Sequence, residues 1–445
     1  MRVLIAPDKF AGTLTAVEAA AAIEEGWRRR DPEAEVLVAP MADGGPGFID
    51  VLSAVVGGTL LSVTVRGLLG DDTPATVLLA GETAYVETAQ ACGLHLVEPK
   101  LRRPEDATTY GVGQLIAAAV DAGAKRIILG LGGSGTNDAG AGLLAALGAT
   151  ATSGHQTPDG DQMPGGDQTP DGGQATGDGR ATGGDQAADG GQAADGGQAA
   201  DAGRAAGGGQ ATGGGQAADG GQLTGGDSAV GASSGRLDAG AAGLAGLTSV
   251  DLEPARARMA GIEFVAASDV ENPMLGLRGA TNIFGTQKGI TDDRKPQVDG
   301  WLTHFAELAD RKTADKKGAG AAGGLGYALL LLGAERVSGI DLVAELTGLK
   351  EKASRVDLVL SGEGAFDFQS RDGKVIAGVA KVANDAMRPC VVLAGKVLIG
   401  AREMRTMGVE SAYSLVDLVG EERAFADAHG SLAAVAERVA RTWAR

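Results

Sequence analysis

Acidic and basic side chains recur directly after the short apolar runs that the sequence predicts to be strands. Asp8 and Lys9 follow the first run, Asp43 follows the second, and Asp269 follows a later one. The loops at the carboxyl ends of an open parallel sheet line one ligand crevice, so we expect these side chains to converge. The loop after residues 358–360 adds three more candidates, which are Glu363, Asp367 and Lys374. The spacing therefore predicts one site that combines carboxylates with cations.

The glycine-rich segment at residues 130–142, GLGGSGTNDAGAG, is the best candidate for a phosphate-binding loop. Its backbone N–H groups and hydroxyls can surround an anion, and the helix that follows directs its positive end to the same place. No Lys-Ser/Thr pair closes the segment, so it is not a Walker A sequence. A tight turn in which Asn137 or Asp138 caps the helix is the simpler alternative. The candidate donors are Gly132, Gly133, Ser134, Gly135 and Thr136.

Phosphoryl transfer needs this mixture of groups. A magnesium ion that bridges phosphates needs carboxylate oxygens, the developing charge needs lysines or backbone N–H groups, and the acceptor hydroxyl needs a carboxylate base. Two simpler readings stay open, because a lone Asp after a strand is more often a turn former and Lys288 could be a solvated surface lysine. The histidines lie outside these loops, which argues against a histidine-based mechanism. The candidate oxygens come from Asp8, Asp43, Asp138, Asp269 and Asp367, and the candidate cations are Lys9, Lys288 and Lys374.

Strands and helices are predicted to alternate along the chain, as in α/β folds. The first forty or so residues form a βαβ unit, in which Thr15 and Glu18 make a capping box that opens a helix through residue 30. Further strands are expected at 76–79, 85–87, 126–131, 262–267, 358–360, 391–394 and 413–415, and further helices at 113–122, 140–147, 297–311, 323–332 and 429–444.

Residues 151–247 differ in composition from the rest of the chain. They are rich in Gly, Gln, Ala, Asp and Thr, and the hexapeptide GGQAAD recurs at 190–195, 196–201 and 214–219. A parallel β-helix is the ordered alternative, but each of its turns needs an inward apolar residue and this repeat offers only Ala. We therefore expect a disordered insert that contributes nothing to the core.

The composition argues against several classes of partner. A net charge of −18 argues against nucleic acid and anionic membrane surfaces, which require a clustered basic face. No apolar stretch approaches the roughly 18 residues of a membrane span, and the first residues, MRVLIAPDKF, are typical of a strand rather than a signal peptide. Cys92 and Cys390 are far apart, so neither a disulfide framework nor a zinc site is indicated. These features predict a cytoplasmic protein.

The ordered motifs of the two flanking stretches resemble one family, the bacterial type I glycerate kinases, which are similar to glycerate 2-kinases. The segments GGSGTNDAGAG and SGEGAFDFQS are the most specific to it. The resemblance runs through both stretches and omits the insert. Its other segments are IAPDKFAGTLTA, PMADGGPG, TTYGVGQLI, SDVENPMLG, FGTQKG, GAGAAGGLG and DGKVIAGVA.

The resemblance implies two α/β domains with the active site in the cleft between them. A discontinuous Rossmann-like or flavodoxin-like domain would comprise residues 1–62 and 296–445, and a second would comprise 63–150 and 248–295, with the insert at 151–247. The resemblance also implies that ATP and D-glycerate give ADP and phosphoglycerate, with the 2-phosphate expected for this class and magnesium as the metal.

The role of each candidate is a hypothesis from the chemistry. Asp269 or Asp43 would orient the glycerate hydroxyl, with Lys9 beside them, and Asp138 and Asp367 would hold magnesium. Replacement of Asp269 by Asn is expected to lower turnover by orders of magnitude. The groups expected to bind ATP are Gly132, Gly133, Ser134, Thr136, Asn137, Lys288 and Lys374, and any of the three lysines could instead meet the substrate carboxylate.

Two other functions remain open at this level. One is a kinase for another sugar acid, such as a longer aldonate. The other is a catalytically silent nucleotide or metabolite sensor whose insert recruits partners. Either a monomer or a homodimer is compatible with the sequence.

Overall fold

The predicted βαβ unit opens the chain. The computed structural model describes residues 1–10, 12–154, 235–371 and 374–444, and it begins with β1 (Arg2–Ile5), α1 (Ala16–Arg30) and β2 (Glu35–Val38). The capping box is confirmed, because Glu18 N donates to Thr15 Oγ1 over 3.1 Å and Thr15 N donates to Glu18 Oε2 over 2.8 Å. These bonds satisfy N–H groups that the first turn of a helix cannot pair internally.

A parallel five-stranded sheet brings the two ends of the chain together. Its order is β13-β12-β11-β1-β2, with β11 (Leu358–Phe366), β12 (Cys390–Val397) and β13 (Ser411–Ser414) supplied by the last part of the chain. Numbered within the sheet, this is the order 2-1-3-4-5 of flavodoxin-like folds, which reverses between β1 and β11. The predicted α/β class is confirmed.

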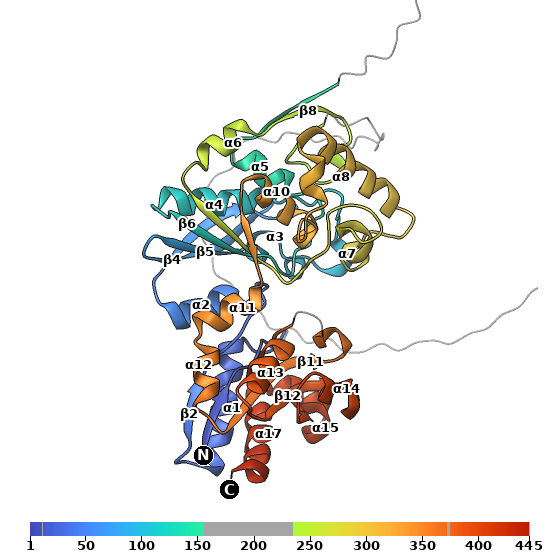
Figure 1. Cartoon of the computed structure of the whole chain (residues 1–445). Coiled ribbons are helices and arrows are strands. Elements are labelled where there is room, and N and C mark those ends of the chain that lie inside the picture. Colours follow the sequence, from blue (N-terminus) through green and yellow to red (C-terminus); the bar gives the residue numbers. More distant parts are fainter. Residues whose placement is uncertain (11, 155–234, 372–373, 445) are drawn as a thin grey trace, which may run out of the picture. The chain divides into compact units, whose positions relative to one another are not determined.

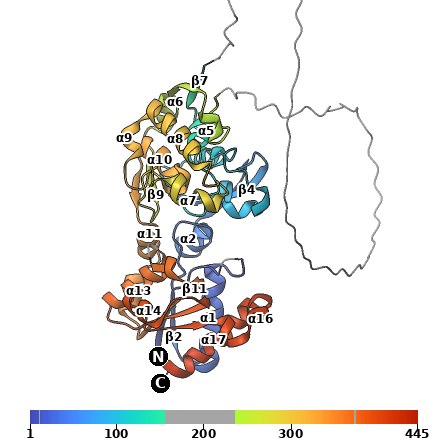
Figure 2. The same ribbon diagram turned by 90° about the vertical axis from the view of Figure 1, so that its right-hand side faces the viewer.

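Helices cover both faces of this sheet. On one face α1 packs against α17 (Ala428–Trp443) so closely that a Cβ on Gly26 would lie 2.0 Å from Ala433 O. The N-terminus and the end of α17 lie side by side in both views (Figures 1 and 2). The opposite face is covered by α12 (Leu349–Ser354) and α13 (Val375–Asp385). The other helices in this part of the chain are α11 (Gly339–Leu346), η5 (Phe368–Arg371), α14 (Ala401–Thr406), α15 (Leu415–Val419) and α16 (Glu421–Ala426).

A mixed six-stranded sheet is built from the middle of the chain. Its order is β10-β9-β6-β5-β4-β3. The first four strands pair in parallel, and β4 pairs antiparallel with both of its neighbours, β5 and β3. The strands are β3 (Thr59–Arg66), β4 (Asp72–Ala80), β5 (Thr83–Glu87), β6 (Arg126–Gly130), β9 (Glu263–Ala267) and β10 (Glu335–Val337).

One face of this sheet shares a large core with α4 (Tyr110–Asp121), α5 (Ala141–Ala146), α8 (Lys295–Ala309) and α10 (Leu325–Leu331). On the other face α2 (Phe48–Val56) packs against β4 and β5. Among the helices of the described ranges, none is long and apolar enough to cross a bilayer. The shorter helices are α3 (Ala89–Cys92), η1 (Leu94–Leu96), η2 (Pro99–Leu101), α6 (Glu253–Arg258), α7 (Ala280–Lys288), α9 (Arg311–Ala314) and η4 (Ala321–Gly323).

The predicted insert was drawn too wide at both ends. Residues Thr150–Ser153 form β7, which pairs with β8 (Leu247–Asp251) in an antiparallel ribbon. Leu237 and Leu244, the latter in η3 (Ala242–Leu244), are buried in the core of the six-stranded sheet. These apolar residues follow the last Gly-rich repeats, and the prediction of an insert at 151–247 wrongly included them. The rest of the predicted insert, from 155 to 234, lies outside the described residues.

The change from one sheet to the other does not coincide with the predicted boundary at 295 and 296. β10 pairs with β9, and α8 and α10 belong to the core of the six-stranded sheet. The return to the five-stranded sheet therefore falls between β10 and β11, after residue 337. Residues 1–155 and 232–445 form one unit by the density of their contacts, and the division of this unit into two domains stays a prediction.

Candidate active site

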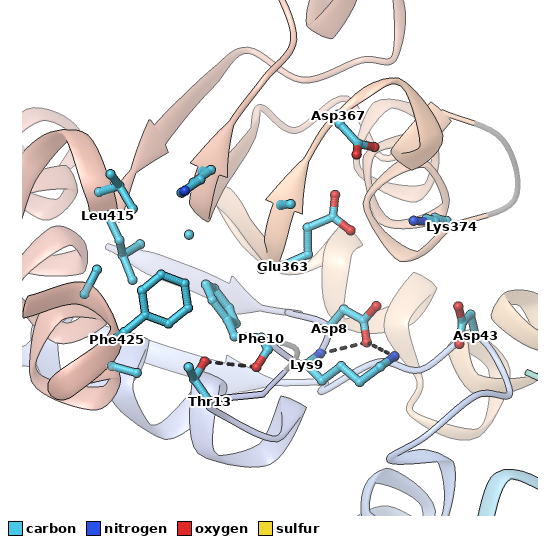
Figure 3. A pocket seen from close by; sticks show the side chains of 17 residues that line it. Asp8, Lys9, Phe10, Thr13, Asp43, Glu363, Asp367, Lys374, Leu415 and Phe425 are labelled. Carbon is cyan, nitrogen blue, oxygen red and sulfur yellow. Dashed lines mark hydrogen bonds and ion pairs between the residues drawn. The ribbon is translucent and has the colours of Figure 1, made fainter. Parts of the chain in front are cut away.

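A large cavity opens at the carboxyl ends of β1, β11 and β12 (Figure 3). Its volume is about 440 Å³, within the range of small-molecule sites. It lies where the strand order of the five-stranded sheet reverses, which is the usual ligand position in open α/β sheets. Its charged lining residues are Asp8, Lys9, Asp43, Glu363, Asp367, Lys374 and Lys396. The predicted convergence of strand-end charges is therefore observed for most of the residues of this sheet.

Asp8 and Lys9 form the charged centre of this cavity. Lys9 N donates to Asp8 Oδ1 over 2.7 Å, and the Lys9 ammonium lies 3.4 Å from the same oxygen. Burial raises the pKa of Asp8 to about 6, although the charge of Lys9 opposes this rise. Burial also lowers the pKa of Lys9, but the negative charges of Asp8 and Asp43 outweigh it and leave that pKa above its usual value. Lys9 therefore stays a cation in a pocket rich in carboxylates.

Two buried glutamates belong to this region: Glu363, which the sequence offered as a candidate without a role, and Glu87, which it did not offer. Glu363 lies within β11 and accepts a hydrogen bond from Ser370 Oγ, while burial raises its pKa to about 7. Glu87, at the end of β5, accepts hydrogen bonds from Gly47 N over 3.1 Å and Ile49 N over 3.2 Å. Burial also raises the pKa of Glu87 to about 7. A carboxyl group with a pKa near 7 can exchange a proton at neutral pH, which is the property of a general base.

The segment SGEGAF was expected to be a loop after residue 360, and this prediction is wrong. β11 continues to Phe366 because its backbone pairs with β12 as far as Val397. The two glycines suggested a turn, whereas here they extend the strand.

Asp43 and Asp269 lie next to each other. Asp43 Oδ1 accepts a hydrogen bond from Gly45 N over 2.9 Å. Asp269 accepts from Ser338 Oγ over 2.6 Å and from Ile340 N over 3.3 Å, which fastens it to the start of α11. Burial raises the pKa of Asp269, and the charge of Asp43 adds to the rise. Of these two carboxylates, Asp43 lines the large cavity.

A glycine brings these two aspartates together. A Cβ on Gly339 would lie 2.4 Å from Asp43 O and 3.3 Å from Asp269 Oδ2, so any larger residue would push the two loops apart. The start of α11 can therefore approach the backbone carbonyl of Asp43 and the carboxylate of Asp269 only because residue 339 has no side chain.

The predicted phosphate loop lines a second, smaller cavity of about 260 Å³ at the carboxyl end of β6. Gly132, Gly133 and Ser134 contribute to its wall together with Lys288. Ser134 Oγ lies 2.9 Å from Thr136 Oγ1 and 3.1 Å from Ala322 O, so this hydroxyl ties the loop to η4. Residues far apart in sequence again converge, but on the edge of the other sheet.

Lys288 is a buried cation in the wall of the smaller cavity. It is 2% exposed, and its ammonium donates to Thr136 O over 2.6 Å. Burial lowers its pKa to about 8. The alternative of a solvated surface lysine is therefore wrong. The segment FGTQKG forms the end of α7, with Gly289 as its C-cap.

Asp138 fastens two helices in the six-stranded part of the chain. Its carboxylate is fully buried and accepts hydrogen bonds from Thr109 N and Thr109 Oγ1, both over 2.8 Å, at the start of α4. It also accepts from Gly140 N over 3.1 Å and Gly142 N over 3.3 Å at the start of α5. Burial raises its pKa, and these hydrogen bonds oppose the rise. Its arrangement is that of a structural anchor.

Asn137 is buried beside Asp138. Its Nδ2 donates to Thr281 Oγ1 over 2.9 Å, whereas its Oδ1 is buried and has no hydrogen-bond partner among the described residues. Buried polar atoms in this state are uncommon and often belong to functional sites. Neither Asn137 nor Asp138 lines the large cavity.

The described residues include no group of three or more His, Cys, Asp and Glu side chains placed to hold a metal ion by themselves. Magnesium that travels with phosphates usually keeps several waters and takes only one or two protein carboxylates. Asp43 and Asp367, which line the large cavity, fit that more modest requirement.

The family model described as "Glycerate kinase family" matches residues 3–168 and 207–444 of this chain. The match covers most of both stretches around the Gly-rich segment, as the ordered motifs had indicated.

Curated relatives and a solved structure resemble the chain along its length. A glycerate kinase of Bacillus subtilis is 34% identical over 423 residues, which cover 94% of this chain and 90% of that protein. A glycerate 2-kinase of Escherichia coli is 31% identical and covers 100% of this chain and 98% of its own length. A crystal structure described as that of a candidate glycerate kinase 2 from Salmonella typhimurium LT2 superposes with a TM-score of 0.69 at 30% identity, covering 99% and 98% of the two chains.

Proposed function

Since the chain belongs to the glycerate kinase family, we propose that it transfers the γ-phosphoryl group of ATP to D-glycerate and releases 2-phosphoglycerate. That it is a kinase acting on glycerate follows from the family. The choice of ATP as donor and of the 2-hydroxyl as acceptor is the proposal. The glycerate 2-kinase among the relatives favours the 2-phosphate.

The large cavity carries this proposal, because it combines carboxylates with lysines at one point of the fold. Lys9 is held charged by its acidic neighbours, and Lys374 is the N-cap of α13, whose first turn presents backbone N–H groups. Cations and a helix N-terminus both stabilise phosphate charge. In phosphoryl transfer, positioning and charge neutralisation supply most of the catalysis.

The smaller cavity suits the acceptor. A hydroxy acid with three carbons needs little room, and its carboxylate needs a cation and hydrogen-bond donors. Lys288 and Ser134 offer both in the wall of this cavity. Burial lowers the pKa of Lys288 to about 8, which means that its charged form is destabilised. An anion bound nearby would stabilise that charged form again.

Asp43 is our first choice for the base that accepts the proton of the glycerate hydroxyl, and Asp269 is the second. Asp43 lines the large cavity, and its loop reaches the smaller one, since a Cβ on Gly132 would lie 2.5 Å from Gly45 Cα. Asp269 is the neighbour of Val270, which lines the smaller cavity, but its oxygens hold the start of α11. The proton would pass from the hydroxyl to the carboxylate as the oxygen attacks phosphorus.

Magnesium is proposed as the metal, with Asp367 as the carboxylate that would hold it. When bound, it would neutralise phosphate charge. Asp138 is not part of this proposal, because its oxygens already accept four hydrogen bonds inside the protein.

One assay tests the proposal directly. The purified chain is incubated with ATP, magnesium and D-glycerate, and the product is identified by NMR. We expect stoichiometric ADP and 2-phosphoglycerate. Formation of 3-phosphoglycerate would contradict the regiochemistry, and a preference for a longer aldonate over D-glycerate would contradict the acceptor.

A further inference from the structure

The large cavity has two ends of opposite character. One end carries the carboxylates with Lys9 and Lys374, whereas the other is lined mainly by apolar side chains (Figure 3). Lys396 is the charged lining residue of the apolar side, where its ammonium pairs with Glu421 of α16 over 2.6 Å. Phe425 and Phe10 lie at this apolar end together with Leu415, away from Asp367 and Lys374. The apolar lining residues are Phe10, Leu415, Val416, Ala424, Phe425 and Ala428.

The apolar end is built on the side of the edge strand β13. Leu415 and Val416 begin α15 directly after β13, Phe425 lies in α16, and Ala428 begins α17. The charged end lies over β1 and β11 instead. An elongated ligand could therefore cross the carboxyl edge of the sheet from β1 towards β13.

The ring of Phe425 is exposed where it lines the cavity. It is 60% exposed, although its neighbours Leu415 and Ala424 are buried, and Phe10 is only 3% exposed. Contiguous apolar surface can mark a ligand-binding site, and Phe425 shares the lining of this cavity with Phe10 and Leu415. A flat aromatic ligand could stack on this ring and cover it.

The middle of the cavity is suited to a ligand that joins the two ends. Gly395 of β12 contributes to the lining between them, and a Cβ there would lie 2.4 Å from Gly364 O. Neither Gly364 nor Gly395 has a side chain that could divide the space. The same cavity thus offers an apolar wall, an open centre and a cationic end.

We infer that the cavity binds a purine nucleotide lengthwise, with its base against Phe425 and its phosphates towards Lys9 and Lys374. This assignment rests on the proposed function, because it takes ATP as the donor. It places the donor phosphates away from the glycine loop of Gly132 and Ser134, contrary to the sequence-based hypothesis. The cavity has an apolar wall, an open centre and a cationic end in that order. A nucleotide with its base at the apolar wall places its phosphates at the cationic end.

Isothermal titration of the full chain with ADP and with inorganic triphosphate tests the assignment. Phe425→Ala should weaken ADP binding by about tenfold to a hundredfold, because base stacking on an aromatic ring is lost. The same variant should bind inorganic triphosphate as the wild type does, since that probe has no base. Phe425→Tyr keeps the ring and should retain ADP affinity within about threefold.

Leu277→Ala is the matched control. Leu277 is 87% exposed and lines neither cavity, so its loss should change neither titration. Unchanged ADP affinity in Phe425→Ala would overturn the inference, as would an equal loss of affinity for both probes.

The proposed function can fail separately from this inference. A wild-type chain that bound ADP through Phe425 but phosphorylated no D-glycerate would remove the proposed function and support the nucleotide site. Conversely, a chain that phosphorylated D-glycerate equally well with Phe425→Ala, at subsaturating ATP, would keep the function and remove the site.

Discussion

The carboxyl edges of the two sheets hold similar sets of residues and use them differently. At the edge of the five-stranded sheet, Asp8, Lys9 and Asp43 line an open cavity. At the edge of the six-stranded sheet, Asp138 is fully buried and bonded to the starts of α4 and α5. Asp43 and Asp138 both follow a strand and precede a glycine-rich turn. Only their environments distinguish them.

A carboxylate at the end of a strand can therefore serve either of two purposes. A carboxylate whose oxygens face a cavity can bind and exchange protons with a ligand, whereas one surrounded by backbone N–H groups positions the chain. Lys288 combines the two uses, because it lines the smaller cavity and also holds Thr136 O. The contrast between the edges predicts which substitutions affect turnover and which affect stability.

The largest expected effect is on turnover in Asp43→Asn. Loss of the base should lower kcat by about 10²–10⁴-fold with little change in the midpoint of urea unfolding. Steady-state assays with ATP and D-glycerate measure it. Asp269→Asn is the matched comparison, and if Asp43 is the base its kcat should fall less. A variant Asp43→Asn with near-normal kcat would show that this edge does not supply the base.

The next effect is on stability in Asp138→Asn. An amide can accept at Oδ1, but its Nδ2 would face N–H donors of Thr109, Gly140 or Gly142 and leave buried groups unpaired. We expect a loss of about 2–4 kcal/mol in the free energy of unfolding. Urea unfolding measures it, and Asp43→Asn serves as the control from the other edge. An unchanged free energy of unfolding in Asp138→Asn would show that Asp138 does not stabilise the fold more than Asp43 does.

A pH effect is expected from Glu363. Burial raises its pKa from 4.5 in the unfolded chain to about 7 in the fold. Its raised pKa means that its favourable contribution is complete below pH 4.5 and is lost as the pH rises through 7. Relative to Glu363→Gln, the wild type should lose on the order of 3 kcal/mol between pH 4.5 and pH 8.

Urea unfolding of both proteins at the two pH values measures the change. Glu33→Gln, at an exposed position, is the control and should show a constant difference. A difference between wild type and Glu363→Gln that does not vary with pH would contradict the environment described for Glu363.

The smallest effect is expected from removing the Gly-rich segment. Deletion of 156–231, with the ends joined, should leave kcat within about twofold, because the described lining residues of both cavities come from other parts of the chain. The matched deletion, 156–246, also removes Leu237 and Leu244 from the core and should cost several kcal/mol of stability, at about 2 kcal/mol for each leucine. Equal behaviour of the two deletions would show that the buried leucines contribute nothing.

Much of the sheet architecture could be predicted from sequence. The capping box at Thr15 and the apolar runs of the parallel strands are local signals, and they indicated the right elements. α2 gave no such signal at its start. Its N-cap is Gly47, without a side-chain hydrogen bond, and the N–H groups of Gly47 and Ile49 are satisfied by Glu87 from β5. A cap supplied from about forty residues away cannot be recognised in a local pattern.

The site was predictable in its residue types but not in its grouping. Sequence placed Asp43, Asp138 and Asp269 in one set, because each follows a strand. Of these three, Asp43 lines the large cavity, whereas Asp269 and Asp138 accept hydrogen bonds from Ser338 and Thr109 inside the protein. Burial decides these roles, and burial depends on contacts that are distant in sequence.

The close packing of α1 against α17 has a consequence for biosynthesis. β1 needs β11 as its neighbour, and α1 needs the backbone of α17 at Gly26, yet both partners are made more than 300 residues later. A ribosome would release the first strand long before its sheet can close, while the strands from β3 to β10 are already complete. Since domains tend to fold as they emerge, we expect the six-stranded part to fold first on the nascent chain. The N-terminal unit would then wait with an exposed strand edge, the state in which a growing chain most needs a chaperone.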